Sequence, residues 1–229
     1  MTRIKSVLFD MDGVLYDSMP NHSIAWQQAM ASFNVQMTAH DAYLYEGMRG
    51  TDTIKLLVKK QQHRELSDEE AQTMYGRKSQ IFHKMHEAPI MPGIFQLMDK
   101  LKSHGITIGI VTGSGQRPLI QRVTNDFANY VLPQHIVTAY DVNHGKPDPE
   151  PYLMGLKKTG NVSPEEAIVV ENAPLGVRAG VAAGIFTIAV NTGPLPDSAL
   201  KDEGANIVFP SMQALANAFP NIKGLRIDE

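Results

Sequence analysis

The chain has 229 residues, enough for one large domain or for one domain with a smaller companion. Its 21 Lys and Arg against 24 Asp and Glu give a net charge of −3, which argues against a nucleic-acid-binding surface or a polybasic membrane anchor. The sequence contains no cysteine, which excludes disulfides, thiolate metal sites and cysteine nucleophiles, so any metal must be held by oxygen or by histidine.

The sequence shows no sign of membrane insertion or secretion. No run approaches about 18 consecutive apolar residues, and the N-terminus lacks the long apolar stretch and cleavage site of a secretory signal. We therefore expect a cytoplasmic protein with no membrane or nucleic-acid partner, and we expect a monomer.

Six short apolar runs alternate with helical patterns along the chain. Continuous runs rich in β-branched residues are typical of strands that are buried on both faces, as in a parallel sheet. Alternation of such strands with helices predicts a doubly wound, Rossmann-like α/β layer. The expected strands are 6–9, 106–111, 136–138, 167–170, 186–190 and 206–209, and the expected helices are about 93–104, 116–127, 150–158, 173–182 and 210–218.

The segment between the first two strands breaks this alternation and is helical in pattern. A helix is expected to begin at Pro20, another covers 51–63, and a third begins at Ser67 with Glu70 three residues later, which is a capping box. We interpret this segment as a helical domain inserted after the first strand. The predicted boundaries are 1–16 and 90–229 for the α/β core and 17–89 for the helical insertion.

Two carboxylates stand where the first strand ends. Asp10 and Asp12 are two residues apart on an extended chain, so their side chains share a face. In open α/β sheets, ligands bind beyond the carboxyl ends of the strands. A Mg²⁺ ion between the two would relieve their repulsion, and a shared proton would make one a nucleophile and the other an acid. An isolated Asp-x-Asp-Gly would as well be a plain turn.

Three further polar groups of residues follow later strands. A hydroxyl and glycines before a helix suit a bound anion, a lysine between Gly and Pro suits a phosphoryl group, and an acid–amide pair suits a metal. Each alone is equally typical of a loop, a solvated lysine or a helix cap. Together they would meet in one crevice and supply what phosphoryl transfer needs. The residues are Thr112, Gly113, Ser114, Lys146, Glu171 and Asn172.

These motifs resemble, in order, the four motifs of the haloacid dehalogenase (HAD) superfamily, and the helical insertion resembles its C1 cap. The segments concerned are 9–15, 111–114, 145–147 and 171–172. Asp17-Ser18, His22 and Trp26 are similar to the β-phosphoglucomutase-like subfamily. The cap loop around Glu46 and the stretch 171–177 resemble more closely the bacterial inorganic pyrophosphatases of the HAD type.

The resemblance implies a chemistry for each motif. Asp10 would attack phosphorus and form an aspartyl-phosphate, while Asp12 would protonate the leaving oxygen and then activate water or an acceptor hydroxyl. Mg²⁺ would be the cofactor. The implied phosphate-binding residues are Thr112, Gly113, Ser114 and Lys146, and the implied metal residues are Asp10, Asp12 through its backbone carbonyl, Asn172, and Glu171 in support of the metal's water shell.

At two places this sequence differs from the residues that are common in the family it resembles. A neutral Asn172 stands where an acid is common, which we expect to weaken Mg²⁺ binding and to ease entry of a highly anionic substrate. The cap loop carries Glu46, and Arg49 lies one residue from the arginine position of β-phosphoglucomutases. Glu46, Arg49 and His22 are the expected substrate-facing residues of the cap, although Glu46 on the surface and His22 on a helix surface are equally ordinary.

Three functions fit this pattern. The favoured one is a Mg²⁺-dependent phosphohydrolase that acts on a small phosphorylated anion such as pyrophosphate. The second is a β-phosphoglucomutase, which must keep water from its phospho-enzyme. The third is a phosphate-binding domain without catalysis, against which the intact Asp10, Asp12 and Lys146 argue.

Overall fold

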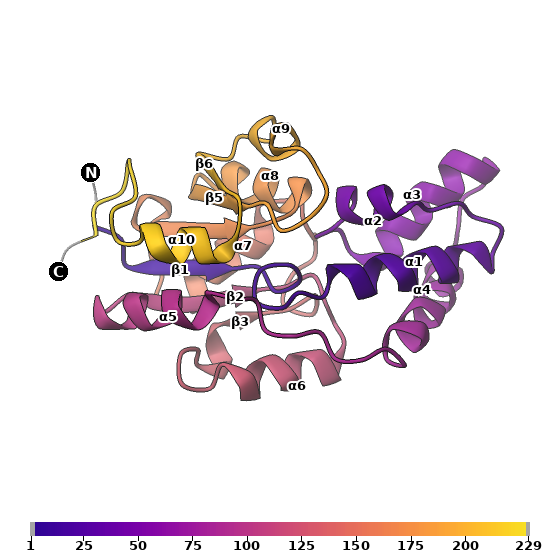
Figure 1. Ribbon diagram of the computed structural model, residues 1–229. Helices are drawn as coiled ribbons and strands as arrows, with labels where there is room; N and C mark the ends of the chain where they lie inside the picture. Colours follow the sequence, from indigo (N-terminus) through magenta and orange to yellow (C-terminus); the bar gives the residue numbers. More distant parts are fainter. Residues whose placement is uncertain (1–2, 228–229) are drawn as a thin grey trace.

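Six parallel strands form the centre of the molecule, and the computed structural model describes residues 3–227 (Figure 1). Their spatial order is β3-β2-β1-β4-β5-β6, with β1 and β4 in the middle. This confirms the expected doubly wound parallel sheet. The strands are β1 Ser6–Phe9, β2 Thr107–Val111, β3 Ile136–Val137, β4 Ala167–Glu171, β5 Phe186–Val190 and β6 Ile207–Phe209.

Helices cover both faces of the sheet because successive strand residues point to opposite sides. Val7 and Phe9 pack with α5, α6 and α10 on one face, whereas Leu8 packs with α7 and α8 on the other. The helices of this layer are α5 Ile94–Ser103, α6 Arg117–Asp126, α7 Glu150–Lys158, α8 Pro174–Ala182, α9 Asp197–Lys201 and α10 Met212–Ala218. The short α9 has no counterpart among the expected helices.

Four helices between β1 and α5 form a separate lobe, which we call the cap (Figure 1). They surround an apolar cluster that includes Met30, Ile54 and Met74. The expected capping box of Ser67 and Glu70 is present. Ile24, in the first cap helix, lies outside this cluster and is 45% exposed. The cap helices are α1 Met19–Ala31, α2 Ala39–Leu44, α3 Gly50–Gln62 and α4 Asp68–Phe82.

The two chain segments that join cap and core run side by side. Tyr16 forms an antiparallel bridge with Ile90, the N–H of Asp17 donates to the carbonyl of Pro89 at 2.9 Å, and the N–H of Met91 donates to Leu15 at 2.8 Å. The predicted domain boundaries fall at this paired connection. A motion of the cap would therefore turn about one narrow two-stranded stem.

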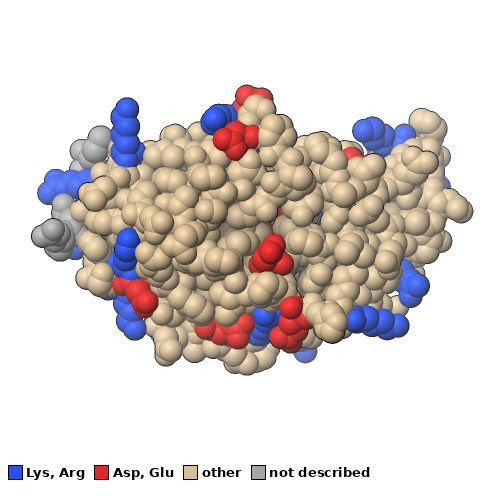
Figure 2. All heavy atoms as spheres, in the orientation of Figure 1, with Lys and Arg blue, Asp and Glu red and all other residues tan. Residues whose placement is uncertain are grey.

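The surface carries no continuous basic patch on the face shown in Figure 2, where Lys and Arg are scattered around the rim. This agrees with the near balance of charge in the sequence. Within residues 3–227, no helix combines the length and the apolar character that crossing a bilayer requires.

Two helical glycines test how closely the layers pack. A Cβ on Gly180 in α8 would lie 2.6 Å from Thr187 Oγ1 and 3.1 Å from Val169 Cγ1, whereas a Cβ on Gly76 in α4 would meet nothing within 4 Å. We expect Gly180→Ala to lower the free energy of unfolding by about 1–3 kcal/mol, because β-branched strand residues have little freedom to move aside. The matched Gly76→Ala should raise it by about 0.5–1 kcal/mol through helix propensity. Urea unfolding of the two variants measures both, and equal effects would contradict this account of the packing.

Candidate active site

The carboxyl ends of three adjacent strands bring the expected site residues together. Asp10 and Asp12 follow β1, Thr112 follows β2 and Asn172 follows β4. The cap lies over them and leaves a partly open cavity of about 40 Å³. Core and cap both line this phosphoryl cavity: Asp10, Asp12, Thr112, Gly113, Ser114 and Gln116 from the core, and His22, Trp26, Glu46, Gly47, Met48, Gly50, Tyr75 and Lys78 from the cap.

Lys146 links two of the strand ends through a buried ion-pair cluster. Its Nζ lies 2.5 Å from Asp10 Oδ1 and 2.7 Å from Glu171 Oε1, and it also donates to the carbonyl of Val111 at 3.2 Å. Burial opposes its charge, but the carboxylates of Asp10 and Glu171 outweigh burial and hold the pKa of Lys146 well above its usual value. The lysine therefore stays cationic beside the expected nucleophile.

Glu171 serves this lysine and is turned away from the role that the resemblance implied. Its Oε1 accepts from Lys146 and from the hydroxyl of Tyr152 at 2.8 Å, and its Oε2 accepts from the N–H groups of Asn172 and Ala173 at 2.9 and 3.1 Å. A Cβ on Gly176 would lie 1.8 Å from Glu171 Oε1, so the glycine makes room for this arrangement. Because both oxygens are engaged and the side chain is fully buried, Glu171 orients Lys146 and does not support a metal's water shell.

Asp12 ends a chain of buried polar groups that joins core and cap. Its Oδ1 accepts from Ser18 Oγ at 2.6 Å and lies 3.0 Å from His22 Nε2, and His22 Nδ1 lies 2.6 Å from Lys78 Nζ. An ammonium group only donates, so His22 accepts at Nδ1 and carries its proton on Nε2, directed at Asp12. Burial and the charge of Lys78 lower the pKa of His22, which keeps the ring neutral.

The phosphoryl cavity holds more acidic than basic groups. Burial raises the pKa of Asp10 to about 8 against the pull of Lys146, and burial with the charges of Asp12 and Asp10 raises that of Glu46 well above its usual value. Despite burial, the electrostatic influence of His22, the hydrogen bonds from His22 and Ser18, and the charge of Lys78 hold the pKa of Asp12 below its usual value. Burial lowers the pKa of Lys78 to about 8. The site must therefore bind protons or a cation to balance its carboxylates.

The loop after β2 presents two hydroxyls and close backbone. Thr112 Oγ1 accepts from the N–H of Ser114 at 3.0 Å, and Ser114 Oγ accepts from the N–H of Gln116 at 3.2 Å. Each hydroxyl keeps its own O–H to donate to an anion. A Cβ on Gly113 would come within 3.2 Å of the carbonyl of Gly47, so the cap loop lies directly against this anion-binding loop.

The residues present fit a Mg²⁺ ion. Among residues 3–227, only Asn172 Oδ1 and Gln116 Oε1 are buried side-chain polar atoms without a hydrogen-bond partner. The amide of Asn172 packs against Gly13, where a Cβ would lie 2.1 Å from Nδ2. Asn172 follows β4, the strand next to β1, at whose end Asp10 stands. An orphaned amide oxygen at this edge of the sheet is the kind of oxygen ligand that a hard divalent cation takes.

The three cap residues expected to face substrate do not share one location. His22 and Glu46 line the phosphoryl cavity. Arg49 does not: its Nε donates to Asp52 Oδ2 at 2.8 Å and its Nη1 donates to the carbonyl of Asn143 at 2.8 Å. Its guanidinium is thus occupied at the edge between cap and core, which corrects the expectation that it contacts the substrate in this cavity.

Three cavity residues escaped sequence reasoning: Lys78, Tyr75 and Gln116. Gln116 Nε2 donates to the hydroxyl of Tyr75 at 3.2 Å, across the boundary between core and cap. The sequence does contain a signal for Lys78, because it follows the apolar Ala71 and Met74 at helical spacing. In the structure all three are buried, and Lys78 is 2% exposed. A lysine within the apolar stripe of a helix indicates a buried charge with a partner.

Comparison with known proteins places this geometry in a family. The model of the haloacid dehalogenase-like hydrolases matches residues 7–190, so the chain belongs to that family. It is 33% identical over 190 residues to hexitol phosphatase A of Escherichia coli, covering 82% of this chain and 84% of that protein. It is 27% identical over 198 residues to the β-phosphoglucomutase of Bacillus subtilis, covering 83% and 84%.

Solved structures agree with the fold. A Bacteroides vulgatus protein described as a candidate β-phosphoglucomutase is 48% identical, with a TM-score of 0.90 over 94% of this chain and 87% of that one. A hydrolase from Pseudomonas syringae is 25% identical, with a TM-score of 0.84 over 95% and 99%. The chain is therefore an enzyme of the phosphatase or phosphomutase class, and the reading as a non-catalytic binding domain is set aside.

The depressed pKa of Lys78 predicts a basic limit to activity. Lys78 is charged below about pH 8 and neutral above it, so its positive charge in the acid-rich cavity is lost as the pH rises through that value. We expect kcat/KM to fall above about pH 8, and Lys78→Arg to move this limb upward by more than one unit, since arginine stays charged. Lys55→Arg, whose half-buried lysine pairs with the exposed Asp68 outside the cavity, is the control. An unchanged basic limb in Lys78→Arg would assign it to another group.

Proposed function

We propose that this enzyme is a Mg²⁺-dependent phosphohydrolase that acts through an aspartyl-phosphate on a small phosphorylated anion, with inorganic pyrophosphate as the leading substrate. The observation that carries the proposal is the size of the cavity beneath the cap. Its volume of about 40 Å³ is small, and the cavity is partly open to solvent. A small anion requires less movement of the cap to enter than a hexose ring does, so the narrow space favours a small anion.

The residues support a two-step reaction. Asp10 attacks phosphorus while the bond from phosphorus to the leaving oxygen breaks, and that oxygen takes a proton from Asp12. The negative charge of the bound substrate raises the pKa of Asp12, so that it can carry this proton. Asp12 then accepts a proton from water as the water oxygen attacks phosphorus and releases Asp10. Ser18 and His22 hold Asp12 in place for both transfers.

A Mg²⁺ ion would be held by Asp10, the backbone carbonyl of Asp12 and Asn172 Oδ1. When bound, it neutralises charge on the transferred phosphoryl group. Glu46 reaches the same cavity from the cap and supplies the negative charge that Asn172 lacks. We also propose that the enzyme is a monomer.

The second candidate is transfer of the phosphoryl group to a sugar. The likeness to proteins named hexitol phosphatase and β-phosphoglucomutase favours a sugar phosphate. A mutase would exclude water from the phospho-enzyme, and a hexose would require the cap to sit farther from the core than it does here.

Steady-state rates with Mg²⁺ separate these candidates. We expect phosphate release from pyrophosphate with kcat/KM about 100-fold above that for hexitol phosphates and β-glucose 1-phosphate. Asp10→Asn and Asp12→Asn should each lose more than about 100-fold, since they remove the nucleophile and the proton donor. Conversion of β-glucose 1-phosphate to glucose 6-phosphate with little phosphate release would replace the proposal by the mutase.

The neutral amide at position 172 gives a second test. Asn172→Asp adds one negative charge, so we expect the Mg²⁺ concentration for half-maximal rate to fall roughly tenfold and the KM for pyrophosphate to rise by a similar factor. Asn129→Asp on the exposed surface is the matched control. Opposite or absent changes in both constants would mean that residue 172 is not near the metal.

A further inference from the structure

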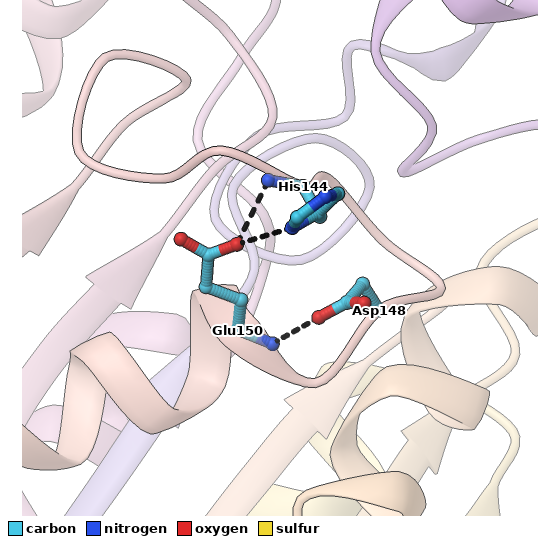
Figure 3. Close-up of side chains that lie close together, drawn as sticks. All are labelled: His144, Asp148 and Glu150. Atoms are coloured by element: carbon cyan, nitrogen blue, oxygen red, sulfur yellow. Dashed lines mark hydrogen bonds and ion pairs between the residues drawn. The ribbon is translucent and has the colours of Figure 1, made fainter.

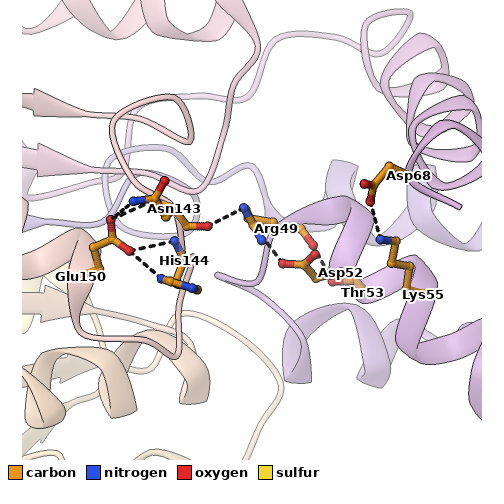
Figure 4. A network of polar contacts seen from close by, with 8 residues as sticks. All are labelled: Arg49, Asp52, Thr53, Lys55, Asp68, Asn143, His144 and Glu150. Atoms are coloured by element: carbon orange, nitrogen blue, oxygen red, sulfur yellow. Dashed lines mark hydrogen bonds and ion pairs between the residues drawn. The ribbon is translucent and has the colours of Figure 1, made fainter. Parts of the chain in front are cut away.

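Arg49 joins two loops that belong to different lobes. It stands immediately before α3 in the cap, and its Nη1 donates to the carbonyl of Asn143 in the core at 2.8 Å (Figure 4). Asp52, in the first turn of α3, holds the Nε side of the same guanidinium at 2.8 Å. The arginine is thus oriented by its own lobe and directed at the backbone of the other.

The acceptor is held rigidly on the core side. Glu150 accepts from the N–H of His144 at 2.8 Å and from His144 Nδ1 at 2.9 Å (Figure 3). It also accepts from the N–H of Asn143 at 2.8 Å (Figure 4). These bonds fix the start of the loop that carries Lys146. The hydrogen bond from Arg49 to the carbonyl of Asn143 therefore holds the loop that positions Lys146 beside Asp10.

Glycine backbone of each lobe packs closely against a side chain of the other along this seam. A Cβ on Gly145 would lie 2.7 Å from Arg49 Cγ, and a Cβ on Gly47 would lie 3.2 Å from Lys146 Cδ. Gly145 has no positive φ, so alanine strains only the contact between the lobes. One methyl group at position 145 would separate the cap loop from the core loop.

We propose that Arg49 is a positioning residue: it latches the cap onto the loop that carries Lys146 and so sets the fraction of molecules in which Glu46 and Lys78 face Asp10 and Asp12. It contacts no substrate. The latch is independent of which phosphate compound the enzyme hydrolyses, because it depends only on contacts between the two lobes.

The single tryptophan reports closure without any substrate. Trp26 lies in the cap, lines the phosphoryl cavity and is 6% exposed with the cap in place. When the cap lifts, the cavity opens and small quenchers reach the indole ring. Acrylamide quenching of Trp26 fluorescence therefore measures the open fraction, whether or not the proposed substrate is correct.

Arg49→Ala, Gly145→Ala and the double variant form a double-mutant cycle, in which Arg49→Ala should suppress the effect of Gly145→Ala. We expect Arg49→Ala and Gly145→Ala each to raise the quenching constant about twofold, and the double variant to match Arg49→Ala alone, since removal of the arginine side chain removes the clash. Arg49→Lys should fall between, because a lysine can still donate to the carbonyl. The control is Arg64→Ala, which breaks a pair with Glu70 and a hydrogen bond to Gln62, both inside the cap.

Activity gives the second readout. A smaller closed fraction raises the apparent KM and lowers the rate together, so kcat/KM should fall about tenfold in Arg49→Ala, the worth of a charged hydrogen bond. Wild-type quenching in both single variants, or additive effects in the double variant, would overturn the latch. A loss of activity in Arg49→Ala with wild-type quenching would also overturn it and make Arg49 a substrate ligand. If pyrophosphate is not hydrolysed at all, the quenching cycle still decides the latch alone.

Discussion

The contact of Lys146 with both Asp10 and Glu171 is the constraint around which the site is built. Three ionisable groups share a place where side-chain exposure is between 0 and 6%. Removing Lys146 would leave two buried carboxyl groups without their cation, which costs far more than the intact cluster gains. Glu171 Oε2 accepts hydrogen bonds from the N–H groups of residues 172 and 173, so the same cluster also fixes the backbone at Asn172.

The cap adds one acidic and one basic group to this cluster. It brings Glu46, which increases the surplus of carboxylates, and Lys78, which offsets it only while protonated. With His22 neutral, the closed site holds four carboxylates and two lysines, and the raised pKa values of Asp10 and Glu46 express that imbalance. A divalent cation would restore both carboxylates to their charged forms. Closure, metal binding and ionisation of the nucleophile are therefore aspects of one electrostatic balance.

The core residues of the site could be predicted from the sequence because each of them directly follows a strand. Each motif follows a strand, and a parallel sheet gathers the ends of neighbouring strands at one edge, so Asp10, Thr112 and Asn172 had to meet. The six strands were recognisable from continuous apolar runs. The helices α2 and α9 were missed because six and five residues are too few for a periodic pattern.

The remaining residues depend on contacts that no local pattern contains. A carboxylate at a strand end can face a metal or an internal lysine, and the space opposite Gly176 decides for the lysine in the case of Glu171. Arg49 is the neighbour of Gly50, which lines the cavity, but the side chain of Arg49 is directed at the core backbone instead. Cap residues acquire their roles only from the placement of one lobe on the other. The width of the cavity follows from the same placement, because glycines at 47, 113 and 145 let the two lobes approach closely.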